Sequence, residues 1–351
     1  MQKPIPSTRP KPKAIDLFSG CGGLTVGLKR AGFEVVGAVE LDPLASETYV
    51  SNHPKVHLWT QDIKTLDPAV VMRELNLVPG QLDLLAGCPP CQGFSTIRTL
   101  NGGRSIIDER NDLIAEFSRF IRELRPKAIM FENVPALAKD ARMEVFRTVL
   151  RELEYQYVED TLDAAAYGVP QRRRRLMLLA RRQGKVGFAR RARVSATVHS
   201  AISHLKPAGT SGDDVHDRLA KHSDYVKKII AAIPKDGGSR SSLPKDLQLA
   251  CHAEFNGFKD VYGRMAWKSI APTITGGCWN PSKGRFLHPT EDRAISLREA
   301  ALLQTFPRRY KFPVHRGKSL VGAMIGNALP PEFVLRHARS VRRAIANDAN
   351  P

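Results

Sequence analysis

The sequence predicts an α/β protein with a doubly wound sheet and a smaller domain inserted into it. From Ala14 to about Arg182, short apolar runs alternate with helical patterns, which favours a parallel sheet with helices on both faces. Residues 191–290 are instead polar and rich in loops. We therefore expect a basic, flexible tail at 1–13, a first domain formed by 14–190 and 291–351, and an insert at 191–290.

The expected strands are short apolar runs bounded by turn residues, at 14–18, 33–40, 82–87, 128–134 and 175–180. After the second run, Asp42 and Pro43 have the types of an N-cap and a first-turn proline, so a helix should run to about Asn52. A further helix is predicted by apolar residues that share one face, at Leu113, Phe117, Phe120, Ile121 and Leu124.

The insert shows helical periodicity only near "YVKKIIAAI", at 225–233. Order returns at "SLREAALLQTF" (296–306), and "GNALPP" (326–331) predicts a turn before a C-terminal helix.

The charge of the chain points to a polyanionic partner. Lys and Arg number 54 against 35 Asp and Glu, a net charge of +19, and nucleic acid is the usual partner of such a protein. A generally basic, well-solvated surface is the alternative. The five cysteines are too few for a disulfide framework, and no apolar run approaches the ~20 residues that cross a bilayer. We expect neither a signal peptide nor a membrane anchor, and a reducing, cytoplasmic location.

A glycine-rich turn follows the first strand in "DLFSGCGGL", the place where open α/β sheets bind ligands. Glu40 ends the second strand, where an acidic residue can accept both hydroxyls of a ribose. The spacing G-x-G-G differs from the G-x-G-x-x-G of pyrophosphate sites, so S-adenosylmethionine fits better than NAD. Asp62 could accept from the adenine amino group. A structural turn with a chance acidic residue is the alternative.

The C-x-x-C pair Cys88 and Cys91 lies in "LLAGCPPCQGFSTI", after a strand. It could be a redox dithiol, half of a zinc site, a buried structural pair, or a nucleophile with a neighbour. No second C-x-x-C or His-rich partner completes a zinc site, and Pro89-Pro90 suggests a rigid loop rather than a helix start. We interpret Cys91 as a nucleophile and Cys88 as a packing residue.

Glu132, in "FENV", should reach the same edge of the sheet. Near an apolar wall, a carboxyl can stay protonated and donate a hydrogen bond to a ring nitrogen. A thiolate, this carboxyl and a methyl donor together indicate methylation of cytosine. The thiolate would add to carbon 6 while Glu132 supports nitrogen 3, and carbon 5 would then take the methyl group.

The chain resembles the cytosine-5 DNA methyltransferases of the bacterial modification type over nearly its whole length. Eight segments match the family's motifs in order: "DLFSGCGG", "AVELDP", "QDI", "GCPPCQGFS", "ENV", "QRRRR", "REAALLQTFP" and "GNALPP". The resemblance implies the class I methyltransferase fold, a Rossmann-like doubly wound sheet, with a target-recognition domain at 191–290. It also implies that a cytosine in a specific duplex sequence is flipped out and methylated through a covalent adduct with Cys91.

The resemblance assigns roles to individual residues. The catalytic set is Cys91, Glu132, Arg173 and Arg175, where the two arginines match positions that hold backbone and target base. The expected contacts to S-adenosylmethionine, which leaves as S-adenosylhomocysteine, are Phe18, Gly20, Gly22, Gly23, Glu40, Leu41, Asp62, Ile63, Pro90 and Asn327. The expected contacts to DNA are Gln92, Ser95, Arg172, Thr273 and Thr275. No metal is expected.

The loop 96–111 would close over the flipped base with Gly102 and Gly103 as hinges, unless it is an ordinary surface loop. "QRRRR" could be a solvated run, although alternate residues of a strand share a face. The partner implied is double-stranded DNA, bound by a monomer associated with the nucleoid, and a cognate restriction endonuclease is a candidate second partner. An RNA methyltransferase, an inactive DNA-binding paralogue, and a redox or zinc protein remain alternatives.

Overall fold

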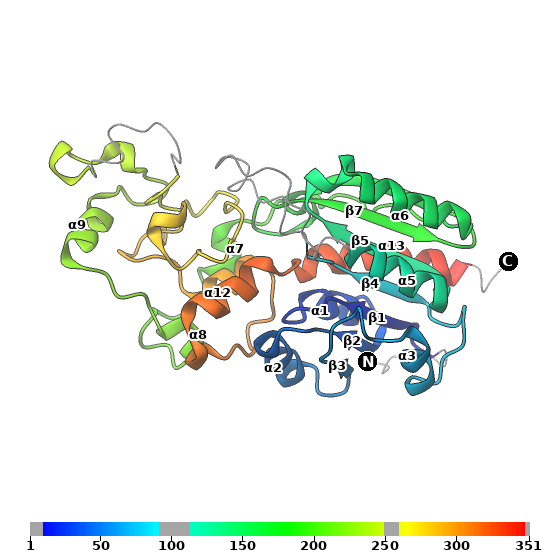
Figure 1. The fold of residues 1–351 in the computed structure, drawn as a ribbon. Coiled ribbons are helices and arrows are strands. Elements are labelled where there is room, and N and C mark those ends of the chain that lie inside the picture. The colour runs from blue at the N-terminus through cyan, green and yellow to red at the C-terminus, as the bar shows by residue number, and fades with distance from the viewer. Residues whose placement is uncertain (1–9, 91–112, 249–259, 348–351) are drawn as a thin grey trace, which may run out of the picture.

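The computed structural model describes residues 10–90, 113–248 and 260–347. A larger part built on a sheet lies beside a smaller part with few regular elements, the described residues of 191–290 (Figure 1). The strands of the described chain are β1 (Lys13–Leu17), β2 (Glu34–Val39), β3 (His57–Trp59), β4 (Leu84–Gly87), β5 (Ala128–Asn133), β6 (Gln156–Asp163) and β7 (Arg174–Arg181). Its α-helices are α1 (Gly23–Arg30), α2 (Pro43–Asn52), α3 (Pro68–Glu74), α5 (Leu113–Leu124), α6 (Ala141–Glu152), α7 (Val198–Ile202), α8 (Asp214–Asp217), α9 (Asp224–Ala232), α11 (Leu297–Leu303), α12 (Lys318–Asn327) and α13 (Pro331–Asn347).

The sheet has the strand order β3-β2-β1-β4-β5-β7-β6. The first five strands in this order pair in parallel, which confirms the doubly wound arrangement. The expectation of a purely parallel sheet is wrong at β7, which is antiparallel to both β5 and β6. Because β7 is reversed, its first residues lie at the same edge as the carboxyl ends of β1 to β5.

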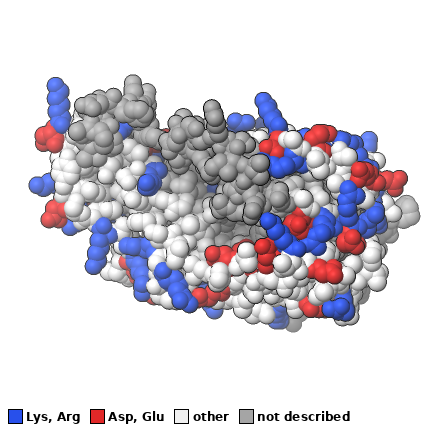
Figure 2. Space-filling view, in the orientation of Figure 1, with Lys and Arg blue, Asp and Glu red and all other residues white. Residues whose placement is uncertain are grey.

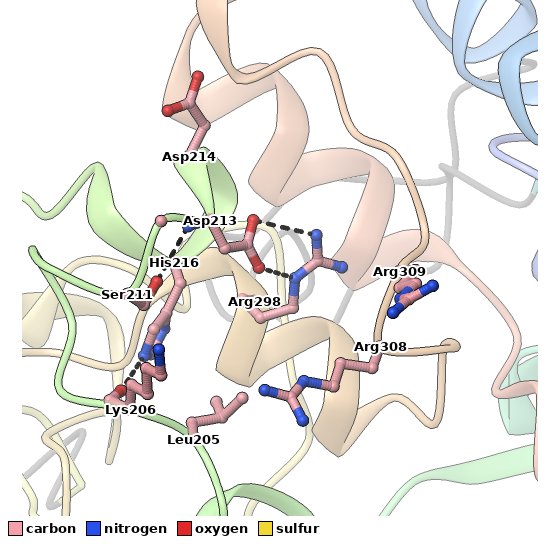
Figure 3. A pocket seen from close by; sticks show the side chains of 10 residues that line it. Leu205, Lys206, Ser211, Asp213, Asp214, His216, Arg298, Arg308 and Arg309 are labelled. Carbon is pink, nitrogen blue, oxygen red and sulfur yellow. Dashed lines mark hydrogen bonds and ion pairs between the residues drawn. The ribbon is translucent and has the colours of Figure 1, made fainter.

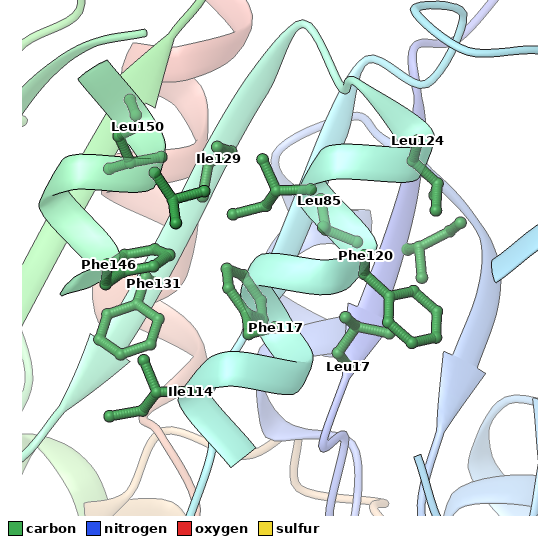
Figure 4. Packing of buried hydrophobic residues seen from close by; sticks show 14 of the residues in the cluster. Leu17, Leu85, Ile114, Phe117, Phe120, Leu124, Ile129, Phe131, Phe146 and Leu150 are labelled. Carbon is green, nitrogen blue, oxygen red and sulfur yellow. The ribbon is translucent and has the colours of Figure 1, made fainter. Parts of the chain in front are cut away.

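Helices cover both faces of the sheet. On one face, α5 packs its predicted apolar side against β4 and β5 (Figure 4). There Phe117, Phe131 and Phe146 stack with ring centroids 4.8–5.9 Å apart, within the range of favourable aromatic pairs. On the other face, α1 packs against α13, and both lie in a second apolar cluster with the sheet. These two layers hold the strand ends in fixed positions.

Local sequence signals explain several element boundaries. The Asp42 side chain accepts from the amide of Ala45 at 2.8 Å, and Pro43 occupies the first turn, as the sequence predicts for α2. Ser296 and Glu299 form a reciprocal capping box that starts α11. The predicted C-terminal helix is confirmed as α13 and the helical segment in the insert as α9.

The smaller part has a core of its own, to which chain from outside the predicted insert contributes. Residues of α7 and α8 and the chain from 265 to 286 share one apolar cluster with α11 and α12. The insert thus packs with most of residues 297–327, although the sequence predicts that these residues belong to the first domain. The domain boundaries at 190 and 291 therefore stay a proposal.

Candidate active site

The residues expected to hold the cofactor follow four neighbouring strands of the sheet. The glycine turn, residues 19–23, comes after β1, and Glu40 comes after β2. Asp62 follows β3, and Pro90, an exposed residue, follows β4. Because parallel strands end at one edge, these residues form a row along it, which is where open α/β sheets bind ligands.

Glu40 is fixed by two backbone amides. The amide of Gly20 donates to its Oε2 at 2.7 Å, and the amide of Asp42 donates to its Oε1 at 2.8 Å. Burial raises the pKa of Glu40, whereas these hydrogen bonds act to lower it. Each carboxylate oxygen keeps a further acceptor position, so the group is suited to accept two hydroxyl donors.

The described residues leave the space next to Gly20 open. Gly20 has φ +54°, and a Cβ built on it would have none of their atoms within 4 Å. Leu41, beside Glu40, leaves 59% of its surface exposed at the same edge. Phe18 also adopts a positive φ, +61°, which is uncommon for a residue with a side chain. An open space bordered by apolar side chains and a fixed carboxylate fits an adenosine.

Two of the residues expected to contact the cofactor, Ile63 and Asp62, already have contacts within the protein. The side chain of Ile63 is buried in the apolar cluster under the sheet. The Asp62 carboxylate already accepts from the amide of Lys64 at 2.9 Å. Asn327 is exposed at the end of α12, and that helix reaches the glycine turn, because the Cys21 thiol lies 3.7 Å from the carbonyl of Met324.

Glu132 and Arg175 form an ion pair at the neighbouring strand ends. The Nε of Arg175 lies 2.8 Å from the Oε1 of Glu132, on the strands β7 and β5. The apolar wall expected around Glu132 is therefore replaced by a guanidinium on this side. Next to it, the side-chain amide of Asn133 donates to the carbonyl of Pro89 at 3.0 Å. This bond holds Pro89, two positions before Cys91, next to the residue that follows Glu132.

Of the two cysteines in the C-x-x-C pair, only Cys88 lies within the described residues. Burial raises the pKa of Cys88 well above its ordinary value, and the nearby carboxylate of Glu132 adds to the shift. Cys88 therefore stays a thiol, which is a poor nucleophile. Cys91, Gln92, Ser95 and the loop glycines 102 and 103 lie outside the described residues.

The alternation expected in "QRRRR" is confirmed. Arg173 is buried and Arg172 and Arg174 are exposed, while Arg175 turns to Glu132. Arg173 donates to the carbonyls of Ile274 and Gly326 at 3.1 and 2.9 Å, so it ties the smaller part to the sheet. Burial lowers its pKa to about 9, so the guanidinium remains charged near neutral pH.

Sequence reasoning missed a pair of buried glutamines behind these arginines. Gln171 and Gln304 bond to each other at 2.6 Å. Gln171 also accepts from the amide of Ile274, and Gln304 donates to the carbonyl of Ile325. Both glutamines stand in the recognised motif segments, and that position was the only signal of their role.

The expected DNA contacts of the smaller part lie next to this junction. The hydroxyl of Thr273 donates to the carbonyl of Arg172 at 2.6 Å, and Thr275 is exposed. In the described ranges no group of three or more His, Cys, Asp or Glu could hold a metal ion. Within the same ranges no helix is long and apolar enough to span a membrane.

Comparison with known proteins assigns the chain to a family. The model of the C-5 cytosine-specific DNA methylases matches residues 12–343. A type II methylase of Herpetosiphon aurantiacus, M.HgiDII, is 37% identical over 94% of both chains. The type II methyltransferase M1.HphI of Haemophilus parahaemolyticus is 32% identical over 95% of this chain and 87% of its own.

A solved structure agrees with this assignment. The crystal structure of a DNA modification methyltransferase encoded within a prophage (E. coli) superposes with a TM-score of 0.68 at 25% identity. The match covers 96% of this chain and 99% of the other. The chain therefore belongs to the C-5 cytosine-specific DNA methylase family and is a DNA (cytosine-5) methyltransferase.

Proposed function

We propose that the protein methylates a flipped-out cytosine in a specific duplex sequence through a covalent adduct with Cys91. The observation that carries this proposal is the Glu132–Arg175 ion pair at 2.8 Å, next to the Pro89–Pro90 segment that leads into Cys91. Arg175 holds the Glu132 carboxyl at the edge of the sheet, where it can support nitrogen 3 of the base.

The residues divide the reaction as follows. The thiolate of Cys91 adds to carbon 6, and the ring electrons shift so that carbon 5 becomes nucleophilic. Glu132, protonated when the base binds, gives its proton to nitrogen 3 and so neutralises the negative charge that develops there, while Arg175 stabilises the resulting carboxylate. After methyl transfer to carbon 5, water takes the proton from that carbon, the thiolate is expelled from carbon 6, and nitrogen 3 returns its proton to Glu132. Cys88, kept as a thiol, does not compete as nucleophile.

Membership of a methyltransferase family implies S-adenosylmethionine as the donor, which supplies an electrophilic methyl group. We place it on the glycine turn, because the described residues leave the space beside Gly20 open and Glu40 presents two fixed oxygens. Leu41 and Phe18 would border the cofactor, with Asp62 and Ile63 at its adenine, Pro90 beside it and Asn327 near its methionine part. The predicted contacts of Gly22 and Gly23 are part of this proposal.

The smaller part is proposed as the target-recognition domain. Thr273 is bonded to Arg172 where this part meets the sheet, and Thr275 follows two positions later. Figure 2 shows Lys and Arg along the lower edge of this part, on the left, while basic and acidic side chains alternate over the sheet. We propose a monomer that acts on double-stranded DNA. A cognate restriction endonuclease remains a candidate partner.

Trapping with 5-fluorocytosine tests the covalent step. Fluorine on carbon 5 cannot leave as a proton does, so the adduct should persist under denaturing conditions. A pool of random duplexes that contain 5-fluorocytosine should capture the wild type and Cys88→Ser in the presence of S-adenosylmethionine, but not Cys91→Ser. Mass mapping should place the base on Cys91. An adduct on Cys88, or capture of Cys91→Ser, would refute the proposal.

A further inference from the structure

Two ring side chains, those of Tyr310 and His53, lie close against the glycine turn at Gly22. A Cβ on Gly22 would lie 2.5 Å from the hydroxyl of Tyr310 and 2.6 Å from Nε2 of His53, so only glycine fits there. Gly22 also has φ +95°, which favours glycine. His53 ends α2, whereas Tyr310 comes from the segment after α11. Because Gly22 has no side chain, the rings of Tyr310 and His53 can lie against the backbone of the turn.

The hydrogen bonds of these two rings run in one direction. The Tyr310 hydroxyl donates its single hydrogen to the carbonyl of Cys21 at 2.5 Å. The Nε2 of His53, 3.0 Å away, must therefore donate to Tyr310. In a neutral imidazole the other nitrogen accepts, and the Nζ of Lys29 lies 3.3 Å from Nδ1. Burial lowers the pKa of His53 to about 4, which keeps the ring neutral.

The Cys21 carbonyl belongs to a peptide plane that is held at both ends. On its other side, the amide of Gly22 donates to the carbonyl of Ser19 at 2.9 Å, which closes a four-residue turn. Because the peptide unit is planar, a bond to the carbonyl also fixes the orientation of that amide. Tyr310 therefore acts on the turn that presents Gly20 to the open space.

Tyr310 also connects the turn to the smaller part. Its carbonyl accepts from Nη1 of Arg298 at 2.8 Å. The same guanidinium binds the Asp213 carboxylate through Nε and Nη2, at 2.6 and 3.2 Å (Figure 3). Asp213 caps α8, which lies in the proposed target-recognition domain. Tyr310 thus contacts the glycine turn with its hydroxyl and is linked through its carbonyl and Arg298 to Asp213 of the smaller part.

We propose that Tyr310 is a positioning residue for S-adenosylmethionine, whose hydroxyl, oriented by His53 and Lys29, holds the glycine turn in its binding conformation. The inference rests on the proposed function, which places the cofactor on this turn. Tyr310 lies behind the turn and acts through Cys21, so it is not a catalytic residue.

The variant Tyr310→Phe removes only the hydroxyl and keeps the ring packed against Phe306 and Phe312. It leaves a buried carbonyl and a buried imidazole N–H without their partner, so the dissociation constant for S-adenosylmethionine should rise about fivefold to thirtyfold. The KM for the cofactor should rise by a similar factor, whereas kcat at saturation and the affinity for duplex DNA should stay within about twofold. Calorimetry and steady-state kinetics measure these quantities.

The chain offers a matched control in Tyr155→Phe. The Tyr155 hydroxyl also donates to a carbonyl at 2.5 Å, that of Pro126, and both tyrosines are 4% exposed. Pro126 precedes β5, at the opposite edge of the sheet. Tyr155→Phe should therefore leave the cofactor affinity unchanged. An equal loss of affinity in both variants would overturn the inference, because it would reflect general destabilisation.

Two substitutions of His53 test the direction of the hydrogen bonds from His53 to Tyr310 and from Tyr310 to Cys21. His53→Gln keeps an N–H donor that can reach Tyr310, whereas His53→Leu has none, so His53→Gln should bind the cofactor more tightly. Equal affinity of the two, or wild-type affinity in Tyr310→Phe, would overturn the inference. Glu40→Ala separates it from the proposed function: if this variant also binds normally, the cofactor does not lie on this turn.

Discussion

Arg173 lies just before β7 and Arg175 two positions later within it, and they have different partners. Arg173 is buried among the carbonyls of Ile274 and Gly326, while Arg175 pairs with Glu132. Strand periodicity predicts that they share a face. It cannot predict which partners they meet, since these come from segments more than forty positions away in the sequence. The role of such a residue is set by tertiary contacts.

The buried carboxyl of Asp16 leads to a testable prediction about the pH dependence of stability. Asp16 is buried at the end of β1, where the Thr25 hydroxyl donates to its Oδ2 at 2.6 Å and its Oδ1 has no hydrogen-bond partner among the described residues. Burial raises its pKa from 3.8 to about 7. Between these values the folded state holds a proton that the unfolded state has released, so this group makes stability fall as pH rises.

The variant Asp16→Asn removes this titration. Urea unfolding at several pH values should show that the variant gains stability relative to the wild type as pH rises from about 4 to about 7. Below about pH 4 the difference should become constant. Parallel stability curves across the whole range would contradict the assignment of this pKa.

At the scale of elements, the antiparallel strand β7 determines the geometry of the site. Its apolar run predicts a strand, but its direction follows from β6, which the sequence analysis missed. The sequence of β6, QYVEDTLD, has no apolar run because most of the strand is only partly buried. Without β6 in the prediction, the chain between β5 and β7 cannot be recognised as returning to the edge at which β5 ends.

Helix α12 was missed for a different reason. Gly322 and Gly326 weaken its helical signal, yet a Cβ on Gly326 would lie 2.3 Å from the amide nitrogen of Gly276. These glycines permit close approach between α12 and the segment around Gly276. Glycine is needed at these positions because of a contact with another segment, and a local sequence pattern does not reveal such a contact.

The smaller part depends on one buried cation. Arg264 is fully buried and donates to the carbonyls of Ile230, Ile233, His288 and Glu291, and it pairs with Asp292. Burial lowers its pKa, and these acceptors are what stabilise the charged group there. A part with few regular elements is thus held by side-chain bonds to its backbone.

Arg264→Met should lower the free energy of unfolding by about 3 kcal/mol, because it leaves buried carbonyls without donors. Urea denaturation followed by circular dichroism and tryptophan fluorescence measures this loss. Lys228→Met, at an exposed position of α9, is the control and should change the stability by less than about 0.5 kcal/mol. Similar values for both variants would show that Arg264 does not hold the smaller part.

At the scale of the whole molecule, affinity and specificity should reside in different regions. The net charge of +19 supplies attraction to any duplex, whereas base contacts are expected from the smaller part. In the larger part, five of the seven described strands could be predicted from their apolar runs, and the residues at the strand ends from their motifs. The division between the parts could not, because α11 and α12 carry family motifs but share their core with the insert.

Binding to duplex DNA of any sequence should depend strongly on salt. Each phosphate neutralised by Lys or Arg releases counterions, so the affinity should fall by about a thousandfold between about 50 and 200 mM salt. Fluorescence anisotropy with a random-sequence duplex measures this dependence. An affinity that hardly changes over this range would contradict a role of the basic charge in DNA binding.

The central claim is that this chain methylates cytosine at carbon 5 in one DNA sequence by means of Cys91. Bisulfite sequencing of DNA from a host without cytosine methylation, in which the protein is expressed, tests the claim most directly. With the wild type, protected cytosines should occur within a single short sequence context, and with Cys91→Ser they should be absent. Absence of protected cytosines with folded wild type, protection without a shared sequence, or protection that survives Cys91→Ser would contradict the account.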